Sequence, residues 1–446
     1  REREVASMGS VWGNNRCCRR VLGGSTVAVG VVLHLASSLA AELPPTPPST
    51  VIFTADDEMK TCYRNPVLIR THTGALICFV EERYRGADWK PSPVGGNHAC
   101  PDNYNTPGHP PFGGHNLAYR RSTDNGTSWG QLTRIAGTVA NLAAANGTDY
   151  TNNAVVEAVL PDGSRKLVYH YGTQNNPSAA QHGRILQRTS IDDGVTWSWP
   201  PMDLTAVGAS VGYPGATPGP AIGVQSRSGR LLFCAWGNRS PVKFGEKGWG
   251  NASNFGNFLA YSDDYGDSWR ASAPITSRGF NECFLARVAG GAEDDAVLEI
   301  SRRTAPDASI PKEEQWPRPT YAQLVFENAS GSLAETTAIT TMDPATIRTP
   351  ICEGALLSHK SVLWFTHPSS ETSRCNLTLH RSSDSGATWE LASTVWPPSA
   401  GGAGYSALAP VGESALGIAF NAWPTADPRS SQDGPGQFIR FRVIAV

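Results

Sequence analysis

The stretch STDNGTSW at residues 122–129 returns three times along the chain, as SIDDGVTW at 190–197, SDDYGDSW at 262–269 and SSDSGATW at 382–389. Every copy keeps the pattern Ser-x-Asp-x-Gly-x-Ser/Thr-Trp, and four such matches in one chain indicate an internal repeat. The chemistry is that of a hairpin turn: Asp accepts hydrogen bonds from the turn backbone, Gly provides a positive φ, and Trp packs beneath. We interpret the four copies as structural turns and not as ligand sites.

Strand-like runs precede the repeats and fill the intervals between them. Those directly before the four turns span residues 116–120, 184–188, 257–261 and 376–381, and helical periodicity is not sustained anywhere. Repeated small sheets around one axis are the expected outcome. The sequence therefore predicts an all-β fold, a six-bladed β-propeller of four-stranded antiparallel sheets, in which blades without the repeat occupy the long interval before its last copy.

The N-terminal residues are typical of a targeting segment. A basic stretch precedes an apolar run at residues 21–39, which ends in small residues, the order of a secretory signal. We predict a signal peptide at residues 1–41, a Pro-rich spacer at 42–50 and the propeller at 51–446. The alternative is a signal anchor, so the expected location is secreted or lumenal, or membrane-anchored.

Composition agrees with an extracytoplasmic globular protein. Six glycosylation sequons begin at Asn125, Asn146, Asn238, Asn251, Asn328 and Asn376. The cysteines that follow the predicted signal are odd in number, which leaves at least one thiol unpaired in a monomer. A net charge of −2 gives no reason to expect a nucleic-acid partner, and the sequence indicates no obligate protein partner.

Short motifs outside the repeats carry candidate chemistry. In chain order they are Tyr63-Arg64-Asn65-Pro66, Phe79 to Arg83 with Asp88 five residues on, Asn281-Glu282-Cys283, Ile300-Ser301-Arg302, His367-Pro368 followed by Arg374, and Gly404-Tyr405-Ser406. The four Ser-x-Asp-x-Gly-x-Ser/Thr-Trp repeats have the pattern known as the Asp box. Together with these repeats, and in their order along the chain, the motifs resemble the sialidase (neuraminidase) family, the non-viral exo-sialidases with BNR repeats. The resemblance implies a retaining exo-glycoside hydrolase that releases terminal α-linked sialic acid, or a related nonulosonic acid such as the deaminated form, from glycans.

The resemblance also implies roles for seven residues. The catalytic residues would be Tyr405, Glu282 and Asp88, and the substrate-binding residues would be Arg64, Arg302, Arg374 and Arg83, with Arg83 either contacting substrate or pairing with Asp88. Three guanidiniums can hold a carboxylate through bidentate, charge-assisted hydrogen bonds. A neutral tyrosine is not repelled by that carboxylate, but its ordinary pKa of ~10 requires a base to activate it. This chemistry needs no cofactor and no metal.

Some positions depart from the family pattern. Asn65 replaces the usual Ile, and Asn421 stands where a glutamate normally braces the first arginine; we expect its amide oxygen to accept a hydrogen bond from Arg64 instead. The long insertion at residues 89–113 is expected to form a flap over the pocket, and its Asp102 is the second candidate for the acid. Histidine and cysteine near it do not follow a metal-ligand spacing: His98, Cys100, His109 and His115.

Two alternatives to hydrolysis remain open at this point. A trans-sialidase would use the same residues and pass the sugar to a second glycan. A non-catalytic propeller that binds sialylated glycans would need neither Tyr405 nor Glu282, so the presence of both favours an enzyme.

Overall fold

The computed structural model describes residues 47–55, 61–84, 114–138, 140–141, 148–174, 183–239, 254–275, 279–288, 297–303, 321–325, 340–342, 345–350, 352–371, 373–423 and 438–446. The predicted signal peptide at residues 1–41 and the insertion at 89–113 lie outside the described residues. Asp88 and Asp102 lie outside them as well.

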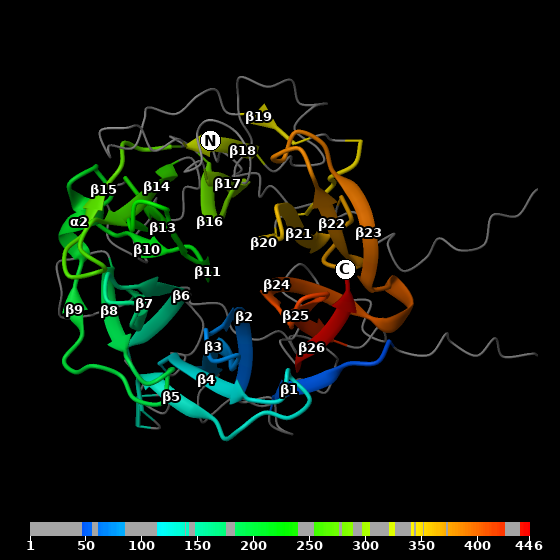
Figure 1. The fold of residues 1–446 in the computed structure, drawn as a ribbon, viewed down its shortest axis with the longest axis horizontal. Helices are drawn as coiled ribbons and strands as arrows, with labels where there is room; N and C mark the ends of the chain where they lie inside the picture. Colours follow the sequence, from blue (N-terminus) through cyan, green and yellow to red (C-terminus); the bar gives the residue numbers. More distant parts are fainter. Residues whose placement is uncertain are drawn as a thin grey trace, which may run out of the picture.

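The described strands form six sheets, which stand as blades in a ring in Figure 1. In chain order the sheets comprise β2 (Thr61–Arg70), β3 (Leu76–Tyr84), β4 (Asn116–Ser122) and β5 (Thr133–Ala136); β6 (Asp149–Val159), β7 (Arg165–Gln174), β8 (Arg184–Ser190) and β9 (Met202–Asp203) with β11 (Ala221–Ile222); β10 (Thr217–Pro218), β12 (Val224–Gln225), β13 (Leu231–Asn238), β14 (Phe255–Ser262) and β15 (Arg270–Ala271); β16 (Phe280–Arg287), β17 (Val297–Arg303), β18 (Tyr321–Val325) and β19 (Thr340–Thr341); β20 (Ala355–His359), β21 (Val362–Pro368), β22 (Leu377–Ser382) and β23 (Glu390–Trp396); and β24 (Gly402–Pro410), β25 (Ala415–Trp423) and β26 (Phe438–Ala445) with β1 (Thr50–Thr54).

The predicted all-β propeller is confirmed, but not every sheet has four strands. The sheets that contain β11 and β12 each have five, and β11 pairs parallel to β6. The reason lies in the segment Thr217 to Gln225, where Pro218 and Pro220 lack the N–H that a continuous inner strand would donate. The segment is therefore cut into two-residue pieces that pair with both neighbouring blades.

The four repeats form the same turn after the third strand of their blades. In the first copy, the hydroxyl of Ser122 accepts a hydrogen bond from the backbone N of Gly126 (2.8 Å), and Asp124 Oδ1 accepts one from the backbone N of Ser128 (2.9 Å). The corresponding bonds in the other copies measure 2.7–2.9 Å. Each repeat glycine has the positive φ that the pattern predicts. The structural interpretation of the repeats agrees with these bonds, and the blades β16–β19 and β24–β26–β1 lack the repeat.

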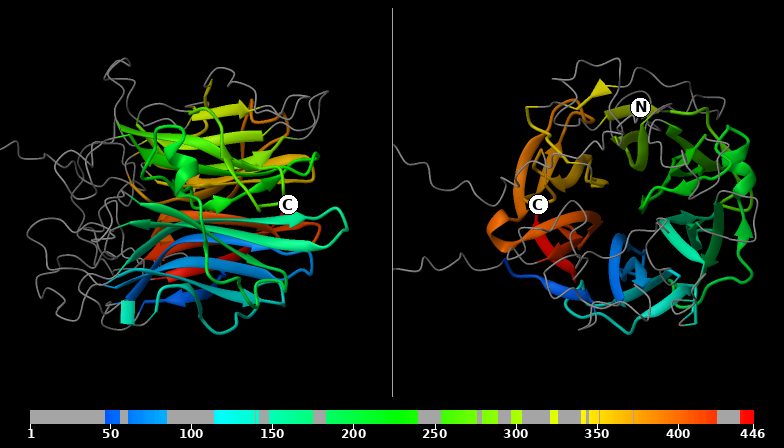
Figure 2. Two further views of the ribbon diagram at one scale, coloured as in Figure 1. Left: turned by 90° about the vertical axis from the view of Figure 1, so that its left-hand side faces the viewer. Right: turned by 180° about the vertical axis from the view of Figure 1, so that it is seen from behind.

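The ring closes through strand pairing between β1 and the last blade. β1 pairs antiparallel with β26, so the blade that contains β24, β25 and β26 takes its outermost strand from the other end of the chain. Figure 2 shows the same closure from behind, where the blue β1 lies against the red and orange strands of this blade. Propellers avoid exposed sheet edges by this kind of circular arrangement.

Apolar side chains from adjacent blades pack together and fix the blades against one another. One buried cluster joins the first two blades, where the ring of Phe79 in β3 stacks on Tyr169 in β7 at a centroid distance of 4.6 Å. Another joins the blade of β24 to that of β2 through Phe53 and Phe441. A blade is therefore packed against the neighbouring blade through these buried clusters, which fixes the place of its inner strand around the axis.

The inner strands are interrupted near the axis by irregular pairing. The ladder shifts register within β2, β6, β16 and β24, around Asn65, Asn152, Glu282 and Tyr405 respectively. Three of these residues have a positive φ, namely Asn65 (53°), Asn152 (41°) and Tyr405 (28°), a region that side chains other than glycine seldom adopt. Bulges of this kind re-aim side chains, and here they lie on the strands that surround the axis (Figure 1).

The described cysteines include both disulfide-bonded and free residues. Cys234 and Cys283 form a disulfide between β13 and β16. Cys62 and Cys375 each take part in a disulfide as well, and Cys78 and Cys352 are buried free thiols.

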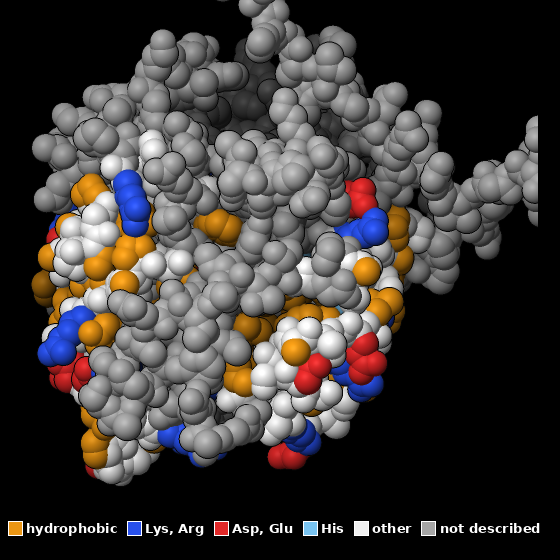
Figure 3. Space-filling model, turned by 90° about the horizontal axis from the view of Figure 1, so that it is seen from above, with side chains coloured by type: hydrophobic (Ala, Val, Ile, Leu, Met, Phe, Trp, Pro, Cys, Tyr) orange, Lys and Arg blue, Asp and Glu red, His pale blue; other side chains and the backbone are white. Residues whose placement is uncertain are grey.

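The surface carries charges of both signs. On the side seen in Figure 3, basic and acidic side chains of the described residues lie next to one another. None of the helices that the structure describes has the length and apolar character required to cross a membrane.

Candidate functional site

Tyr405 occupies the bulge of β24 with its side chain only 5% exposed. Its φ of 28° is a strained value, of a kind that costs on the order of 1–3 kcal/mol and is often found at functional sites. The backbone N of Tyr405 donates a hydrogen bond to Cys352 Sγ (3.3 Å). Packing around Gly404 is tight, since a Cβ there would lie 3.2 Å from both Arg374 Cδ and Cys352 Sγ.

Tyr405, Glu282 and Arg302 form one hydrogen-bonded group although they come from three strands. The Tyr405 hydroxyl donates to Glu282 Oε1 (2.7 Å), and Arg302 Nη1 donates to the Tyr405 oxygen (2.7 Å). Arg302 Nη1 also forms an ion pair with Glu282 Oε2. The Tyr405 hydroxyl is thus held by a carboxylate on one side and by a guanidinium on the other.

Three predicted arginines surround the same tyrosine ring. The guanidinium carbons of Arg64, Arg302 and Arg374 lie 5.3, 5.9 and 5.1 Å from the ring centroid of Tyr405. Arg64 and Arg374 are 4% and 9% exposed, so their charges are held in a region with little water. Such a cluster of partly desolvated guanidiniums attracts an anion strongly, and a carboxylate matches its geometry.

Burial and charge set the protonation of this group. Burial raises the pKa of the Tyr405 hydroxyl above its ordinary value, and the charge of Arg302 opposes that effect only in part. Burial by itself lowers the pKa of the Arg302 guanidinium, but the charges of Glu282 and Tyr405 raise it by more than burial lowers it. The guanidinium therefore stays charged. Tyr405 is therefore a neutral hydrogen-bond donor in the resting protein.

Arg83 is also buried, and it pairs with a carboxylate of its own strand. Its Nε donates to Glu81 Oε2 (2.8 Å) within β3, whereas Asp88 lies outside the described residues. Glu81 Oε1 also accepts hydrogen bonds from Asn65 Nδ2 (2.9 Å) and the backbone N of Asn152 (2.7 Å). Burial raises the pKa of Glu81, but Arg83 and these donors outweigh it and hold the pKa below its usual value. Glu81 is thus an ionised anchor for Arg83 and for two of the inner bulges.

The hydrogen bond expected from Arg64 to the amide oxygen of Asn421 is not found. The amide nitrogen of Asn421 donates instead to the backbone oxygen of Tyr63 (3.0 Å), and its buried Oδ1 accepts no hydrogen bond from the residues that the structure describes. The bond to the backbone is the closer option because Asn is one methylene shorter than the glutamate that the resemblance leads one to expect. Asn421 therefore steadies the strand beside Arg64 and not its guanidinium.

Sequence reasoning missed Glu353, a carboxyl next to this group. Glu353 is 1% exposed, follows Cys352 directly, and its Oε1 has no hydrogen-bond partner in the described part of the chain. Burial raises its pKa well above the usual value, and the negative charge of Glu282 adds to that effect. Its surroundings therefore favour the neutral form of the Glu353 carboxyl. An acidic residue at the start of an apolar strand was the signal that could have indicated it.

Two groups of side chains have the spacing of metal ligands within the described residues. Cys234, Cys283 and Glu299 form one, but its cysteines are joined as a disulfide and are not free to ligate. His72, Glu157 and Asp193 form the other, at the surface. Three of the four His and Cys residues near the insertion that we considered as ligands lie outside the described residues; the fourth, His115, lies 3.9 Å from Asp149.

Comparisons with known proteins agree with the repeats and the fold. Residues 120–418 match the family described as BNR repeat-like domain. The chain is 31% identical to human Sialidase-4 over 263 residues, which is 56% of this chain and 47% of that protein. It is 22% identical to a sialidase of Bacteroides fragilis over 387 residues, 82% of this chain and 61% of that protein. The chain thus spans about half to three fifths of the length of these relatives.

Solved structures share the fold at low identity. The NanB sialidase from Streptococcus pneumoniae, in complex with 2-[(3-chlorobenzyl)ammonio]ethanesulfonate, superposes with a TM-score of 0.64 at 12% identity and covers 92% of this chain and 73% of that one. The leech intramolecular trans-sialidase gives a TM-score of 0.59 at 14% identity and covers 90% and 70%. With its four Asp-box turns and its propeller, the chain belongs to the BNR repeat-like domain family.

Proposed function

We propose that this protein is an exo-glycoside hydrolase that releases terminal α-linked sialic acid, or a related nonulosonic acid such as the deaminated form, from glycans. The observation that carries the proposal is the group of Tyr405, Glu282 and Arg302, with Arg64 and Arg374 against the same ring. Sialylated glycans, or glycans capped by another such acid, are the proposed partners. The named relatives are sialidases, which supports this substrate class.

The arginines would bind the carboxylate that such a sugar carries on its anomeric carbon. Arg64, Arg302 and Arg374 approach from three blades, so together they can fix both the charge and the orientation of that group. In a region with little water each charge-assisted bond is stronger than a neutral one. Bound in this way, the anomeric carbon would lie next to the Tyr405 oxygen.

The first half of the reaction would form a covalent bond to Tyr405. Its oxygen attacks the anomeric carbon while its proton passes to Glu282 Oε1, which already accepts that hydrogen bond. The bond from the anomeric carbon to the leaving oxygen breaks, and Asp88 would supply the proton that this oxygen needs. A neutral nucleophile suits this substrate because a carboxylate would be repelled by the sugar acid.

The second half would restore the enzyme. Asp88, now ionised, takes a proton from water as the water oxygen attacks the anomeric carbon, and the bond to Tyr405 breaks. Glu282 returns its proton to the Tyr405 oxygen, and Arg302, which donates to both groups, stabilises the charge that develops on them. Two displacements at one carbon retain its configuration.

A transferase would differ only in the acceptor of the second half. If a glycan hydroxyl replaced water, the same residues would pass the sugar on, and the fold likeness to a leech trans-sialidase does not separate the two. A glycan-binding propeller without activity would have no use for the Tyr405–Glu282 pair. Product analysis with and without an added acceptor glycan separates hydrolysis from transfer.

The decisive experiment is a release assay on paired aryl ketosides of N-acetylated and deaminated nonulosonic acids. Release of either sugar with retained configuration supports the proposal, and the ratio of the two rates gives the acyl preference. A fluorinated ketoside should trap an adduct on Tyr405, which peptide mass mapping would locate. An adduct on Glu282 or Asp88 would overturn the assignment, and neither adduct nor release would favour the binding propeller.

A further inference from the structure

A buried polar chain lies directly behind Glu282 and Arg302, and the proposed chemistry does not use it. The side-chain amide of Asn257 in β14 donates to the backbone oxygen of Asn281 (2.7 Å) and to Ser301 Oγ (3.0 Å). Asn281 is the residue before Glu282, and Ser301 is the residue before Arg302. One amide group therefore holds the neighbours in sequence of both members of the ion pair.

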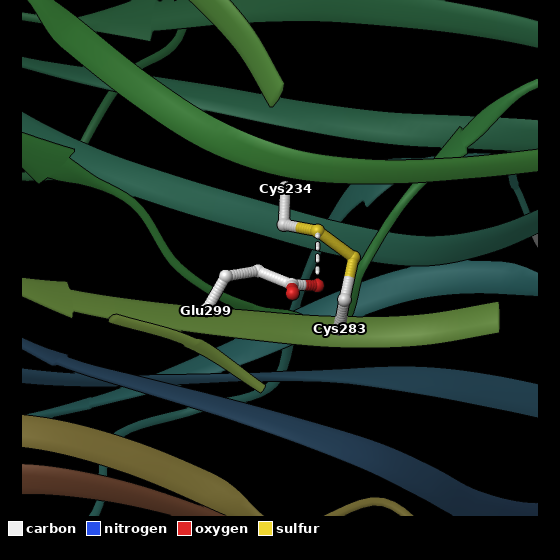
Figure 4. Close-up of side chains that lie close together, drawn as sticks. All are labelled: Cys234, Cys283 and Glu299. Atoms are coloured by element: carbon white, nitrogen blue, oxygen red, sulfur yellow. Dashed lines mark hydrogen bonds between the residues drawn. A yellow bond between two sulfur atoms is a disulfide. The ribbon is translucent and has the colours of Figure 1, made fainter. Parts of the chain in front are cut away.

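The chain continues to a buried acid and to the disulfide. Ser301 Oγ donates to Glu299 Oε1, and the side chain of Glu299 lies against the Cys234–Cys283 disulfide, with Oε1 3.7 Å from Cys234 Sγ (Figure 4). Cys283 is the residue after Glu282. The backbone on both sides of Glu282 is thus tied down, on one side through Asn257 and on the other through a covalent bond to β13.

The backbone pairing explains why such a tie is needed. The ladder between β16 and β17 shifts register between Phe280 and Cys283, so Glu282 and Arg302 face each other across a bulge. A bulge leaves a backbone group without its ladder partner, and the backbone oxygen of Asn281 is instead satisfied by Asn257.

Burial and protonation are consistent with a permanent structural tie. Asn257, Ser301 and Glu299 are each 0–1% exposed. Burial raises the pKa of Glu299 to about 7, against the opposing hydrogen bonds from Ser301 and Asn257, so the carboxyl is mostly neutral in mildly acidic solution. A buried neutral acid avoids the large cost of an unpaired buried charge.

We propose that Asn257, Ser301 and Glu299 form a positioning brace that sets Glu282 against Arg302 for proton transfer from Tyr405. The inference rests on the proposed function and adds three residues to it. Because Arg302 Nη1 contacts both Tyr405 and Glu282, a small displacement of its strand alters both contacts together. Displacements near 1 Å in an active site cost roughly 10²-fold in rate.

Ser301→Ala tests the brace with the loss of one oxygen atom. The matched control is Ser262→Ala, which removes an equally buried hydroxyl from the outer turn at the end of β14. We expect Ser301→Ala to lower kcat on an aryl ketoside by at least about 10-fold, within the range for misplaced groups, at a thermal midpoint similar to that of Ser262→Ala. The control should keep the kcat of the wild type.

Glu299→Gln and Glu299→Leu provide a second, independent comparison. Gln keeps an acceptor for Ser301 and should retain most of the activity, whereas Leu removes it and should lower kcat as Ser301→Ala does. If Ser301→Ala and Ser262→Ala have equal kcat while the wild type is active, the brace is wrong and the proposed function stands. If the wild type releases no nonulosonic acid from any ketoside, the proposed function fails and the brace fails with it.

Discussion

The outer turns of the blades repeat one design four times, whereas the inner strand ends differ from blade to blade. In every Asp-box turn the serine hydroxyl and the aspartate carboxylate accept the same backbone hydrogen bonds. At the inner ends, bulges fall at Asn65, Asn152, Glu282 and Tyr405, so their side chains are amides in two blades, a carboxylate in the third and a phenol in the fourth.

The two regions also differ in the exposure of their hydrogen-bonded polar groups. Among the described residues, buried side-chain atoms without a hydrogen-bond partner occur in both regions: on and beside the inner strands they include Asn65 Oδ1, Asn281 Oδ1 and Glu353 Oε1, and in one outer turn they include Asp193 Oδ1 and Trp197 Nε1. What separates the regions is therefore the exposure of the bonded groups, since the Asp-box carboxylates are bonded at the surface whereas Glu282 and Tyr405 are bonded in the buried interior. The comparison predicts that outer substitutions alter stability and inner substitutions alter chemistry.

The largest effect is expected from Tyr405→Phe. Removal of the hydroxyl should lower kcat on an aryl ketoside by at least about 10³-fold, since loss of a nucleophile abolishes the normal route. Stability should fall by about 1 kcal/mol, because Glu282 and Arg302 can still pair with each other. Stopped assays and thermal melts measure both quantities. Full activity in this variant would remove Tyr405 from the proposed mechanism. It would also contradict the expectation that substitutions at the inner strand ends alter the chemistry.

A smaller but still large effect is expected from Arg374→Lys. Lysine keeps the charge but loses the planar fork, and we expect kcat/KM to fall by roughly 10²-fold, equivalent to ~2–3 kcal/mol. Arg381→Lys is the control from the same blade, where the guanidinium is exposed and pairs with Glu390. Equal kcat/KM in the two variants would show that Arg374 does not bind substrate.

At the outer rim, Asp264→Ala should act on stability alone. Asp264 accepts from the backbone N of Ser268 (2.8 Å) and from Ser262 Oγ (2.7 Å), and loss of these bonds should cost about 1–2 kcal/mol of the free energy of unfolding. Urea denaturation measures this cost. The activity per folded molecule should match that of the wild type, and a fall in kcat would show that outer turns and inner site are coupled.

The smallest effect is expected from mild acid, which should lower the stability of the fold through two buried histidines. Burial lowers the pKa of His380 to about 4, and burial together with His380 lowers that of His367 to about 3. Because both rings bind protons more weakly when folded, their contribution to stability is complete above pH 6.5 and is lost as pH falls toward these values. When the pH falls from 7 to 6, each ring should lower the free energy of unfolding by up to about 1 kcal/mol.

The variant His380→Gln separates this effect from others. Its free energy of unfolding should depend less on pH between 7 and 6 than that of the wild type, as measured by urea titrations at both values. Asp264→Ala is the control, because hydrogen bonds from Ser268 and Ser262 outweigh burial and keep the pKa of Asp264 below its usual value, outside this interval. An unchanged slope in His380→Gln would mean that the ring does not titrate as inferred.

The regions differ in the same way in how far the sequence predicts them. The eight residues of each Asp box include the side chains that stabilise its turn, so the turns can be predicted from a short stretch of sequence. Their repetition along the chain predicts the all-β propeller. The five-stranded sheets were missed because strand pieces near Pro218 pair with a neighbouring blade, which no local window contains. Tyr405, Glu282 and the three arginines were found only through family order, and the structure brings all five together.

The residues that were missed depend on contacts between distant strands. The pKa of Glu353 is raised because the fold buries it near Glu282, and Asn257 matters because its amide reaches two other strands. The pairing of Arg83 with Glu81 was not foreseen, and a contact of Arg83 with Asp88 or with substrate stays a prediction. The role of Asp88 itself remains a prediction.

Ring closure by β1 and β26 has a consequence for how the protein is made. Tyr405 belongs to the one sheet that needs strands from both ends of the propeller, since β1 precedes Arg64 whereas β25 and β26 follow Tyr405. On the ribosome the first five blades can be completed before this sheet can form. The nascent chain would therefore carry an arginine cluster without its tyrosine, and the last step of folding would also be the step that assembles the site.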